Sequence, residues 1–474
     1  MNTLEYVRTN FMQKPNFFYP GDHSSWTVEA LDDLPFLPTG KCNIHSTSDL
    51  KSLFATVKDD FIFLYLKQEL PSMGEYALER MIRVAEDTGA GMVYANYQEI
   101  SEGKRCNHPL NDYQTGSIRD DFDFGPLLLI RTEAAKKAFL KGETNYKHAG
   151  LYDLRLKLSE SHELVHLDEY LYTLDETDQR SSDEKMFAYV DPKNRSVQLE
   201  MEQACTEHLK AIGAWMPPIF ENVDLTDGSF PVEASVIIPV RNRNKTIADA
   251  IASVLSQETD FPFNLIVVDN HSTDGTTETI AKFAARDKRI VHLLPERTDL
   301  GIGGCWNVGV QNEACGRFAI QLDSDDVYSG NDTIRQIVQA FYEQKCAMLV
   351  GTYRMCDIRW NTIPPGIIDH KEWTPENGRN NALRINGLGA PRAFFTKALR
   401  ILKVPNTSYG EDYALGLQFS RRWKIGRIYD VLYLCRRWEE NSDASIDLVK
   451  LNANNAYKDK LRSIEIAARK QWNK

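Results

Sequence analysis

Residues 234–270 read ASVIIPVRNRNKTIADAIASVLSQETDFPFNLIVVDN. Two short apolar runs, at 234–238 and 264–268, flank a segment over 246–257 whose apolar residues recur at helical spacing. Pro239 stops the first run, and polar residues follow both runs directly. The order of strand, helix and strand predicts one unit of a parallel α/β sheet.

The same alternation continues towards the C-terminus. The pattern predicts a helix over 276–285, a strand over 290–294, a helix over 305–313 and a strand over 318–322. Repeated strands and helices indicate a doubly wound α/β sheet, in which ligands bind at the carboxyl ends of the strands. We therefore look for functional residues directly after each predicted strand.

An acidic cluster follows the strand over 318–322. Asp323, Asp325 and Asp326 lie within four residues, and side chains two apart in an extended chain point the same way. Crowded carboxylates repel one another unless a cation neutralises them, which favours a hard divalent ion that also binds phosphate oxygens. A solvated turn that caps the next helix explains the cluster equally well.

Five segments in order resemble family 2 glycosyltransferases of the GT-A fold. They are SVIIPVRNR (235–243), VVDNHSTDGT (267–276), GIGGCWNVGV (301–310), FAIQLDSDD (318–326) and YGEDYALGLQFS (409–420). The resemblance covers residues 234–437 and implies an α/β, Rossmann-like mixed sheet. It also implies a hexosyltransferase that moves a sugar from a nucleotide-sugar donor, with UDP preferred to GDP.

The resemblance assigns donor-binding roles to residues after three predicted strands. Asp269 would contact the edge of the base, Asp323 the ribose or the metal shell, and Asp325 would coordinate Mn²⁺ or Mg²⁺, whereas the role of Asp326 is less fixed. The remaining candidates for nucleotide binding are Pro239, Val240, Arg241, Asn242 and Ser324. Many relatives have a histidine near 436–438 that helps to hold the metal, and this chain has Arg-Arg-Trp there.

The resemblance also places the general base. Asp412 would accept the proton of the attacking hydroxyl, and Glu411 would position acceptor hydroxyls or support the site electrostatically. Attack by an external hydroxyl on one face predicts inversion, from an α-linked donor to a β-linked product. Without the acidic cluster, a plain helix cap would be the preferred interpretation of Asp412. The loop over 386–391 has glycines that allow close approach of a sugar, and it is equally well explained as a tight loop.

The N-terminal region resembles the later half of the transferase segment. Residues 62–97 align without a gap with 318–353, and a second window aligns Tyr152 with Tyr413. In this alignment Lys67 and Glu69 replace Asp323 and Asp325, and Gly150 and Leu151 replace Glu411 and Asp412. We therefore expect a smaller, degenerate and non-catalytic GT-A-like domain. The expected divisions are this domain at 1–176, a linker with a bridging helix at 177–231, the catalytic domain at 232–445 and an amphipathic helix at 446–474.

Composition excludes some classes of protein. The formal net charge of −11 argues against nucleic acid as a partner, and no segment has the ~20 apolar residues of a membrane span, so we expect a cytoplasmic protein. The eight cysteines show no C-x-x-C pattern and predict free thiols. The basic C-terminal helix is expected to pack on the catalytic domain, with peripheral contact to anionic lipid as the second interpretation.

Two other functions compete with glycan or glycoconjugate (polysaccharide) synthesis on a carbohydrate or lipid-linked acceptor. A sugar-phosphate nucleotidyltransferase shares the acidic metal site, but it requires a glycine-rich loop after the first strand, and Arg241-Asn-Arg243 is a poor match. A catalytically inactive carbohydrate-binding protein would not need Asp323, Asp325 and Asp412 together.

Overall fold

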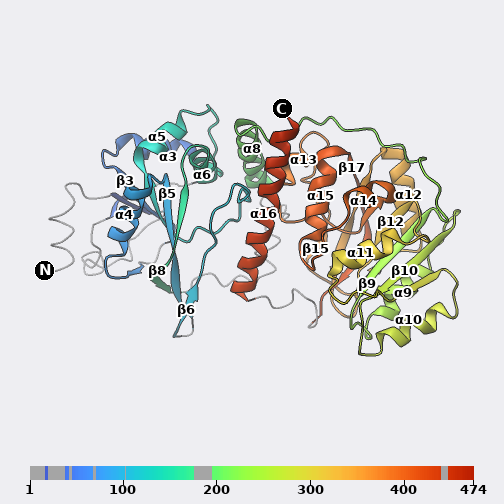
Figure 1. The fold of residues 1–474 in the computed structure, drawn as a ribbon. Helices are drawn as coiled ribbons and strands as arrows, with labels where there is room; N and C mark the ends of the chain where they lie inside the picture. Colours follow the sequence, from blue (N-terminus) through green and yellow to red (C-terminus); the bar gives the residue numbers. More distant parts are fainter. Residues whose placement is uncertain are drawn as a thin grey trace. The chain divides into compact units, whose positions relative to one another are not determined.

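A computed structural model describes residues 16–19, 38–41, 45–67, 71–101, 103–175, 195–438 and 447–474. The chain divides into two compact units, each with its own sheet (Figure 1). The first unit comprises residues 1–215 together with 447–474, and the second comprises residues 216–446. The predicted α/β class is confirmed for both sheets.

The second unit is built on a nine-stranded mixed sheet with the order β11-β10-β9-β12-β16-β14-β17-β13, and β15 pairs with β14. Its strands are β9 (Ala234–Val240), β10 (Phe263–Asp269), β11 (Ile290–Leu293), β12 (Phe318–Gln321), β13 (Val327–Tyr328), β14 (Met348–Cys356), β15 (Thr362–Ile368), β16 (Arg392–Phe395) and β17 (Ile425–Arg436). Its helices are α9 (Ile247–Leu255), α10 (Thr276–Ala284), α11 (Ile302–Gln311), α12 (Thr333–Gln344), α13 (Gly378–Asn381), α14 (Thr396–Leu402) and α15 (Glu411–Arg422).

The parallel part of this sheet places the predicted functional loops at one edge. Strand β9 pairs in parallel with β10 on one side and with β12 on the other, so the carboxyl ends of the three strands point the same way. All three strands are almost entirely buried, which is why their sequences are apolar runs rather than alternating patterns. The antiparallel strand β16 then lies beside β12 and brings the residue at its start, Arg392, to the same edge.

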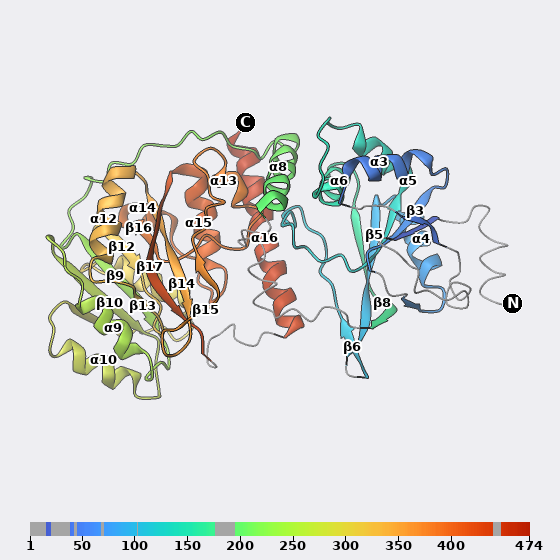
Figure 2. The ribbon, with the colours of Figure 1, turned by 180° about the vertical axis from the view of Figure 1, so that it is seen from behind.

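The first unit carries an eight-stranded sheet with the order β2-β1-β3-β7-β5-β8-β4, and β6 pairs with β5 (Figure 2). Its strands are β1 (Asn16–Tyr19), β2 (Pro38–Lys41), β3 (Phe61–Tyr65), β4 (Ser72–Met73), β5 (Met92–Ser101), β6 (Lys104–His108), β7 (Leu127–Arg131) and β8 (Leu164–Asp175). Its helices are α3 (Thr47–Thr56), α4 (Ala77–Thr88), α5 (Thr132–Phe139), α6 (Gly150–Ser159), α8 (Arg195–Ala211) and α16 (Leu448–Trp472).

The two sheets have the same topology from β2 to β4 and from β10 to β13. Each pair of neighbouring strands in the first unit has the same relative direction, parallel or antiparallel, as its counterpart in the second unit. The parallel pair β5–β8, for example, corresponds to the parallel pair β14–β17. In those two pairs Tyr97 faces Tyr172 and Tyr353 faces Tyr433, as the sequence alignment requires. The likeness extends beyond the expected second half, because β1 and β2 occupy the places of β9 and β10.

The ungapped alignment is wrong by one residue on strand β3. Phe61 pairs with the last residue of β7 just as Phe318 pairs with the last residue of β16, so the two phenylalanines are equivalent. Asp323 therefore corresponds to Leu66 and not to Lys67, and the counterpart of Asp325 is residue 68, not 69, outside the described residues. The first unit has one residue more between Phe61 and the start of α4 than the second unit has between Phe318 and the start of α12.

Helices α8 and α16 both belong to the first unit. The expected bridging helix, α8, packs on α6, and Glu200 on α8 accepts hydrogen bonds from the backbone amides of His148 and Ala149. The C-terminal helix α16 contacts the segment 111–119, where Asp459 accepts a hydrogen bond from Ser117. Our expectation that α16 packs on the catalytic domain is therefore corrected.

The described residues bear on two expectations, the absence of a membrane-spanning helix and the absence of disulfide bonds. In these ranges no helix is long and apolar enough to cross a membrane. The seven cysteines that the structure describes are free thiols, in agreement with the absence of a disulfide pattern; Cys42 lies outside the described residues.

Candidate active site

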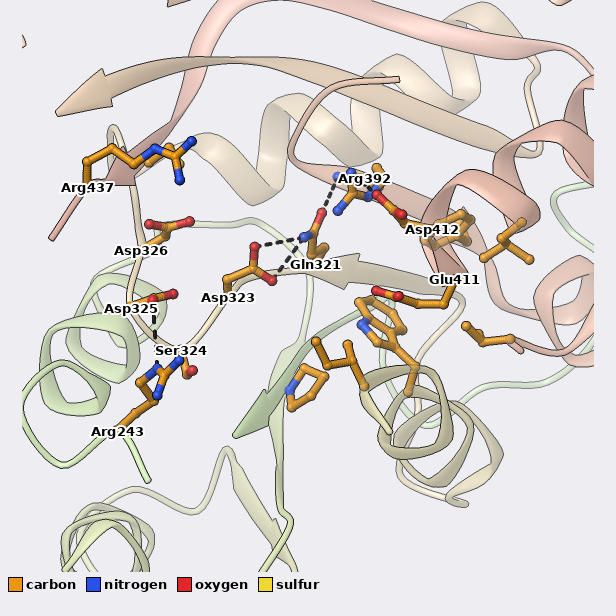
Figure 3. Close-up of a pocket in the computed structure, with 17 residues that line it drawn as sticks. Arg243, Gln321, Asp323, Ser324, Asp325, Asp326, Arg392, Glu411, Asp412 and Arg437 are labelled. Atoms are coloured by element: carbon orange, nitrogen blue, oxygen red, sulfur yellow. Dashed lines mark hydrogen bonds and ion pairs between the residues drawn. The ribbon is translucent and has the colours of Figure 1, made fainter. Parts of the chain in front are cut away.

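A cavity of about 290 Å³ opens at the edge of the second unit's sheet where β9 and β12 end (Figure 3). One wall is formed by the loop after β12, and the opposite wall by the start of α15 together with the start of β16. The lining residues are Pro239, Arg243, Ile302, Trp306, Gln321, Asp323, Ser324, Asp325, Asp326, Arg392, Phe394, Val404, Glu411, Asp412, Leu415, Cys435 and Arg437. The cavity thus brings together the two carboxylate clusters that the sequence keeps far apart.

The first wall carries the acidic cluster. Asp325 lies 3.8 Å from Nε of Arg243 and accepts a hydrogen bond of 3.4 Å from the indole of Trp438. Burial, and next the neighbouring Asp323, raise the pKa of Asp325 in spite of Arg243. Asp326 is fully buried and accepts a hydrogen bond from the backbone amide of Arg436. Carboxylates in this crowded arrangement favour a bound cation or a proton.

The second wall carries the other carboxylates, in the first turn of α15. Asp412 forms a 2.8 Å ion pair with Nη1 of Arg392 and accepts a hydrogen bond from the amide of Tyr413. Glu411 points into the cavity, and within the described part of the chain its Oε2 has no hydrogen-bond partner (Figure 3). Burial, followed by repulsion from Asp412, raises the pKa of Glu411 to about 7.

Three polar residues of the cavity, Arg243, Gln321 and Arg392, were assigned no role by the sequence analysis. Gln321 donates to both carboxylate oxygens of Asp323, at 3.0 and 3.1 Å, and accepts from the backbone amide of Arg392 at 3.2 Å. A glutamine inside the apolar run FAIQL is a signal that could have been noticed, because a polar side chain in a buried strand needs a partner. Arg392 follows the loop over 386–391, where only the glycines drew attention.

Four of the predicted donor-binding residues do not line this cavity. Val240 is buried, Arg241 is exposed, and Asn242 uses its carbonyl oxygen to accept a hydrogen bond from the amide of Thr273. Asp269 has no exposed surface, and it accepts hydrogen bonds from the amide of Ser272 and the hydroxyl of Thr277. The Asp269 carboxylate thus forms hydrogen bonds within its own loop. A contact between Asp269 and a nucleobase stays a prediction.

The residues present fit a divalent cation only in part. Asp323 and Asp325 offer carboxylate oxygens to the cavity, but in the ranges that the structure describes no group of three or more His, Cys, Asp or Glu side chains is arranged to hold a metal ion. Mg²⁺ commonly takes one or two carboxylates and completes its shell with water and substrate phosphates. A carboxylate pair is therefore sufficient for a cation that binds together with a diphosphate.

An α/β sheet with two carboxylate clusters across one cavity fits an enzyme that uses carboxylates for acid–base or metal chemistry, and similarity to known proteins identifies the family. The model of "Glycosyl transferase family 2" matches residues 235–402. A curated relative from Escherichia coli, "UDP-Glc:alpha-D-GlcNAc-diphosphoundecaprenol beta-1,3-glucosyltransferase WfgD", is 34% identical over 204 residues, or 43% of this chain and 76% of the relative. The chain therefore belongs to glycosyl transferase family 2, and it is a glycosyltransferase, as the sequence predicts.

The chain is also similar to other proteins over part of its length. An "Uncharacterized glycosyltransferase" of Haemophilus influenzae is 29% identical over 41% of this chain and 74% of the relative. Three rickettsial relatives are longer, and the match covers only 14 to 15% of each. A solved structure of TarS residues 1–349 from S. aureus in complex with UDP-GlcNAc is 24% identical, with a TM-score of 0.38, and the match covers 50% of this chain and 72% of that one.

Proposed function

We propose that the second unit is a metal-dependent, inverting glycosyltransferase that moves a sugar from a UDP-sugar to a hydroxyl acceptor. The observation that carries the proposal is the single cavity with Asp323 and Asp325 on one wall and Glu411 and Asp412 on the other. Nucleotide-sugar transfer needs one set of groups for the leaving diphosphate and another for the attacking hydroxyl. The cavity offers both sets across a space suited to a sugar ring.

The donor wall has residues of both charges. Mn²⁺ or Mg²⁺ held by Asp323 and Asp325 would stabilise the negative charge that develops on the leaving diphosphate. Arg243 and Arg437 also line the cavity, and their guanidinium groups suit phosphate oxygens. Pro239 and Ser324 lie beside them, which supports their proposed place next to the nucleoside.

The acceptor wall supplies the base. Asp412 would take the proton from the attacking hydroxyl, while Glu411, whose free oxygen faces the cavity, would hold a hydroxyl of the acceptor or sugar. A hydroxyl that attacks from this wall reaches the anomeric carbon on the face opposite the diphosphate, which predicts inversion. The name of the E. coli relative, with a UDP-Glc donor and a diphosphoundecaprenol-linked acceptor, favours a lipid-linked glycan acceptor in glycoconjugate synthesis.

A panel of sugar nucleotides tests this proposal before any acceptor is known. With Mn²⁺ present, we expect one UDP-sugar to raise the melting temperature and to be hydrolysed slowly by the wild-type protein. Asp325→Asn and Asp412→Asn should each lower turnover by about 100-fold or more. Asp332→Asn, at the half-buried N-cap position of α12 and outside the cavity, should have no effect. Only Asp325→Asn should also abolish binding of the UDP-sugar.

Two results would contradict the proposal. Unchanged turnover in both cavity variants would remove the assignment of the site. A product that keeps the donor's anomeric configuration in an NMR time course would exclude the inverting mechanism.

A further inference from the structure

Arg392 connects the two walls of the cavity. Its Nη1 forms a 2.8 Å ion pair with Oδ2 of Asp412 and donates a 2.8 Å hydrogen bond to the carbonyl of Gly389. Its backbone amide donates to Gln321, which in turn binds both oxygens of Asp323 (Figure 3). A network of hydrogen bonds and one ion pair therefore links the carboxylate of Asp323, through Gln321 and Arg392, to the carboxylate of Asp412.

The first unit has the same sheet topology without this network of side-chain contacts. The pairing of β3 with β7 makes Leu64 and Leu128 the counterparts of Gln321 and Arg392. The counterparts of Asp323 and Asp412 are also leucines, Leu66 and Leu151. All four leucines belong to or pack against the hydrophobic core of that unit. The fold thus forms with leucine at all four positions, so Gln321 and Arg392 are not there to build the sheet.

The charges around Asp412 explain what an arginine adds. Glu411 precedes Asp412 on the same turn of α15, and Asp323 faces these two residues across the cavity. Repulsion between the carboxylates disfavours the state in which all of them are ionised. The charged groups that share the cavity with Asp412 are Arg243, Asp323, Asp325, Asp326, Arg392, Glu411 and Arg437. Arg392 is the cation in direct contact with Asp412, whereas Arg243 contacts Asp325. Opposite charge at 2.8 Å favours the ionised carboxylate.

We propose that Arg392 is a positioning residue that fixes the Asp412 carboxylate in the cavity and keeps it, rather than Glu411, ionised for catalysis. This inference rests on the proposed function of Asp412 as the base. It divides the work between adjacent carboxylates: Asp412 is ready to accept a proton, and Glu411 retains one and can donate a hydrogen bond. The burial and like-charge repulsion that raise the pKa of Glu411 to about 7 agree with this division.

Three variants of the full-length chain test the inference. Arg392→Leu takes the residue that the first unit already has at this position, Arg392→Lys keeps the charge, and Arg335→Met removes an exposed arginine on α12 as the matched control. Turnover is measured at saturating donor from pH 5.5 to 9.5. Donor binding is measured separately, by the thermal shift with UDP and Mn²⁺.

For Arg392→Leu we expect turnover at pH 7 to fall by about 10- to 100-fold, with the affinity for UDP changed by less than about two-fold because the donor wall is intact. In the plot of turnover against pH, the rise on the acidic side should move to higher pH, since Asp412 then competes with Glu411 for a proton. Part of the activity should therefore return near pH 9. Arg392→Lys should restore most of the turnover and the wild-type pH profile. Arg335→Met should match the wild-type protein throughout.

The inference is overturned if Arg392→Leu keeps its turnover and the rise on the acidic side stays at the same pH. It is equally overturned if the leucine and lysine variants lose melting temperature, UDP binding and turnover together, because that pattern describes a purely structural residue. Failure of the proposed function looks different: the wild-type protein would then turn over no sugar nucleotide, before any variant is compared.

Discussion

At the scale of single residues, Glu411 is a cavity carboxyl group whose environment changes its titration. Its pKa rises from 4.5 to about 7, because burial and the neighbouring Asp412 disfavour its charge. The folded protein therefore keeps a proton that the unfolded chain loses between these two pH values. By linkage, this group's contribution to the free energy of unfolding falls as the pH rises from about 4.5 to 7.

Glu411→Gln should remove this dependence, because an amide has the same shape and does not titrate. The difference in free energy of unfolding, variant minus wild-type protein, should increase by on the order of 1–3 kcal/mol when the pH is raised from 5 to 8. Urea denaturation at both pH values, in EDTA to remove metal, measures the difference. Glu343→Gln, at an exposed position on α12, is the control. Parallel curves for Glu411→Gln and the wild-type protein would refute this explanation.

The sequence contained much of the candidate site, but not the contacts that join it. Acidic residues directly after an apolar strand predict a cavity position, and Asp323, Ser324 and Asp325 do line the cavity. Arg392 carries no such local signal, because its partners meet it only in the folded chain: Gln321 through the pairing of β12 with β16, and Asp412 from the first turn of α15. The local sequence pattern predicts where each strand ends, but it does not predict the hydrogen bonds that form between residues of different strands.

At the scale of secondary structure, helix α16 shows how amphipathic spacing can mislead. In the sequence, Arg462 and Arg469 are among the residues that make this helix basic and suggest contact with anionic lipid. Both are fully buried in the structure, where Arg462 pairs with Asp459 and Arg469 pairs with Glu465. Spacing along a helix fixes which residues share a face, but not which face meets a neighbouring element.

The buried pair network gives a prediction for α16. Asp459 accepts hydrogen bonds from Ser117, Arg119 and Arg462 and has no exposed surface. Asp459→Ala would leave two buried guanidinium groups short of their shared counter-charge, so we expect a loss of ~3–5 kcal/mol in the free energy of unfolding. Urea denaturation measures it, with Asp332→Ala as a control for a surface pair, where the loss should stay below ~1 kcal/mol. Equal, small losses in both variants would show that Asp459 is solvated.

At the scale of the whole molecule, the chain contains the same sheet topology twice, with opposite chemistry at one edge. In the second unit that edge is a charged cavity, and in the first its counterparts are Leu64, Leu66, Leu128, Gly150 and Leu151. The repeat could be predicted from sequence because tyrosines and apolar positions recur at matched spacing. The added pair of strands could not, since β1 and β2 are four residues each and lack a distinct pattern.

The loss of the carboxylates from the first unit predicts a single donor site in each chain. Leucines offer neither ligands for a cation nor acceptors for a ribose, so we propose that the first unit is non-catalytic and leaves nucleotide-sugar binding to the second. Calorimetric titration of the full chain with a UDP-sugar and Mn²⁺ should give one binding event per chain. Asp325→Asn should abolish that event without exposing a weaker one. A second event that survives in this variant would place a nucleotide site on the leucine-lined sheet, and the first unit would then need another explanation.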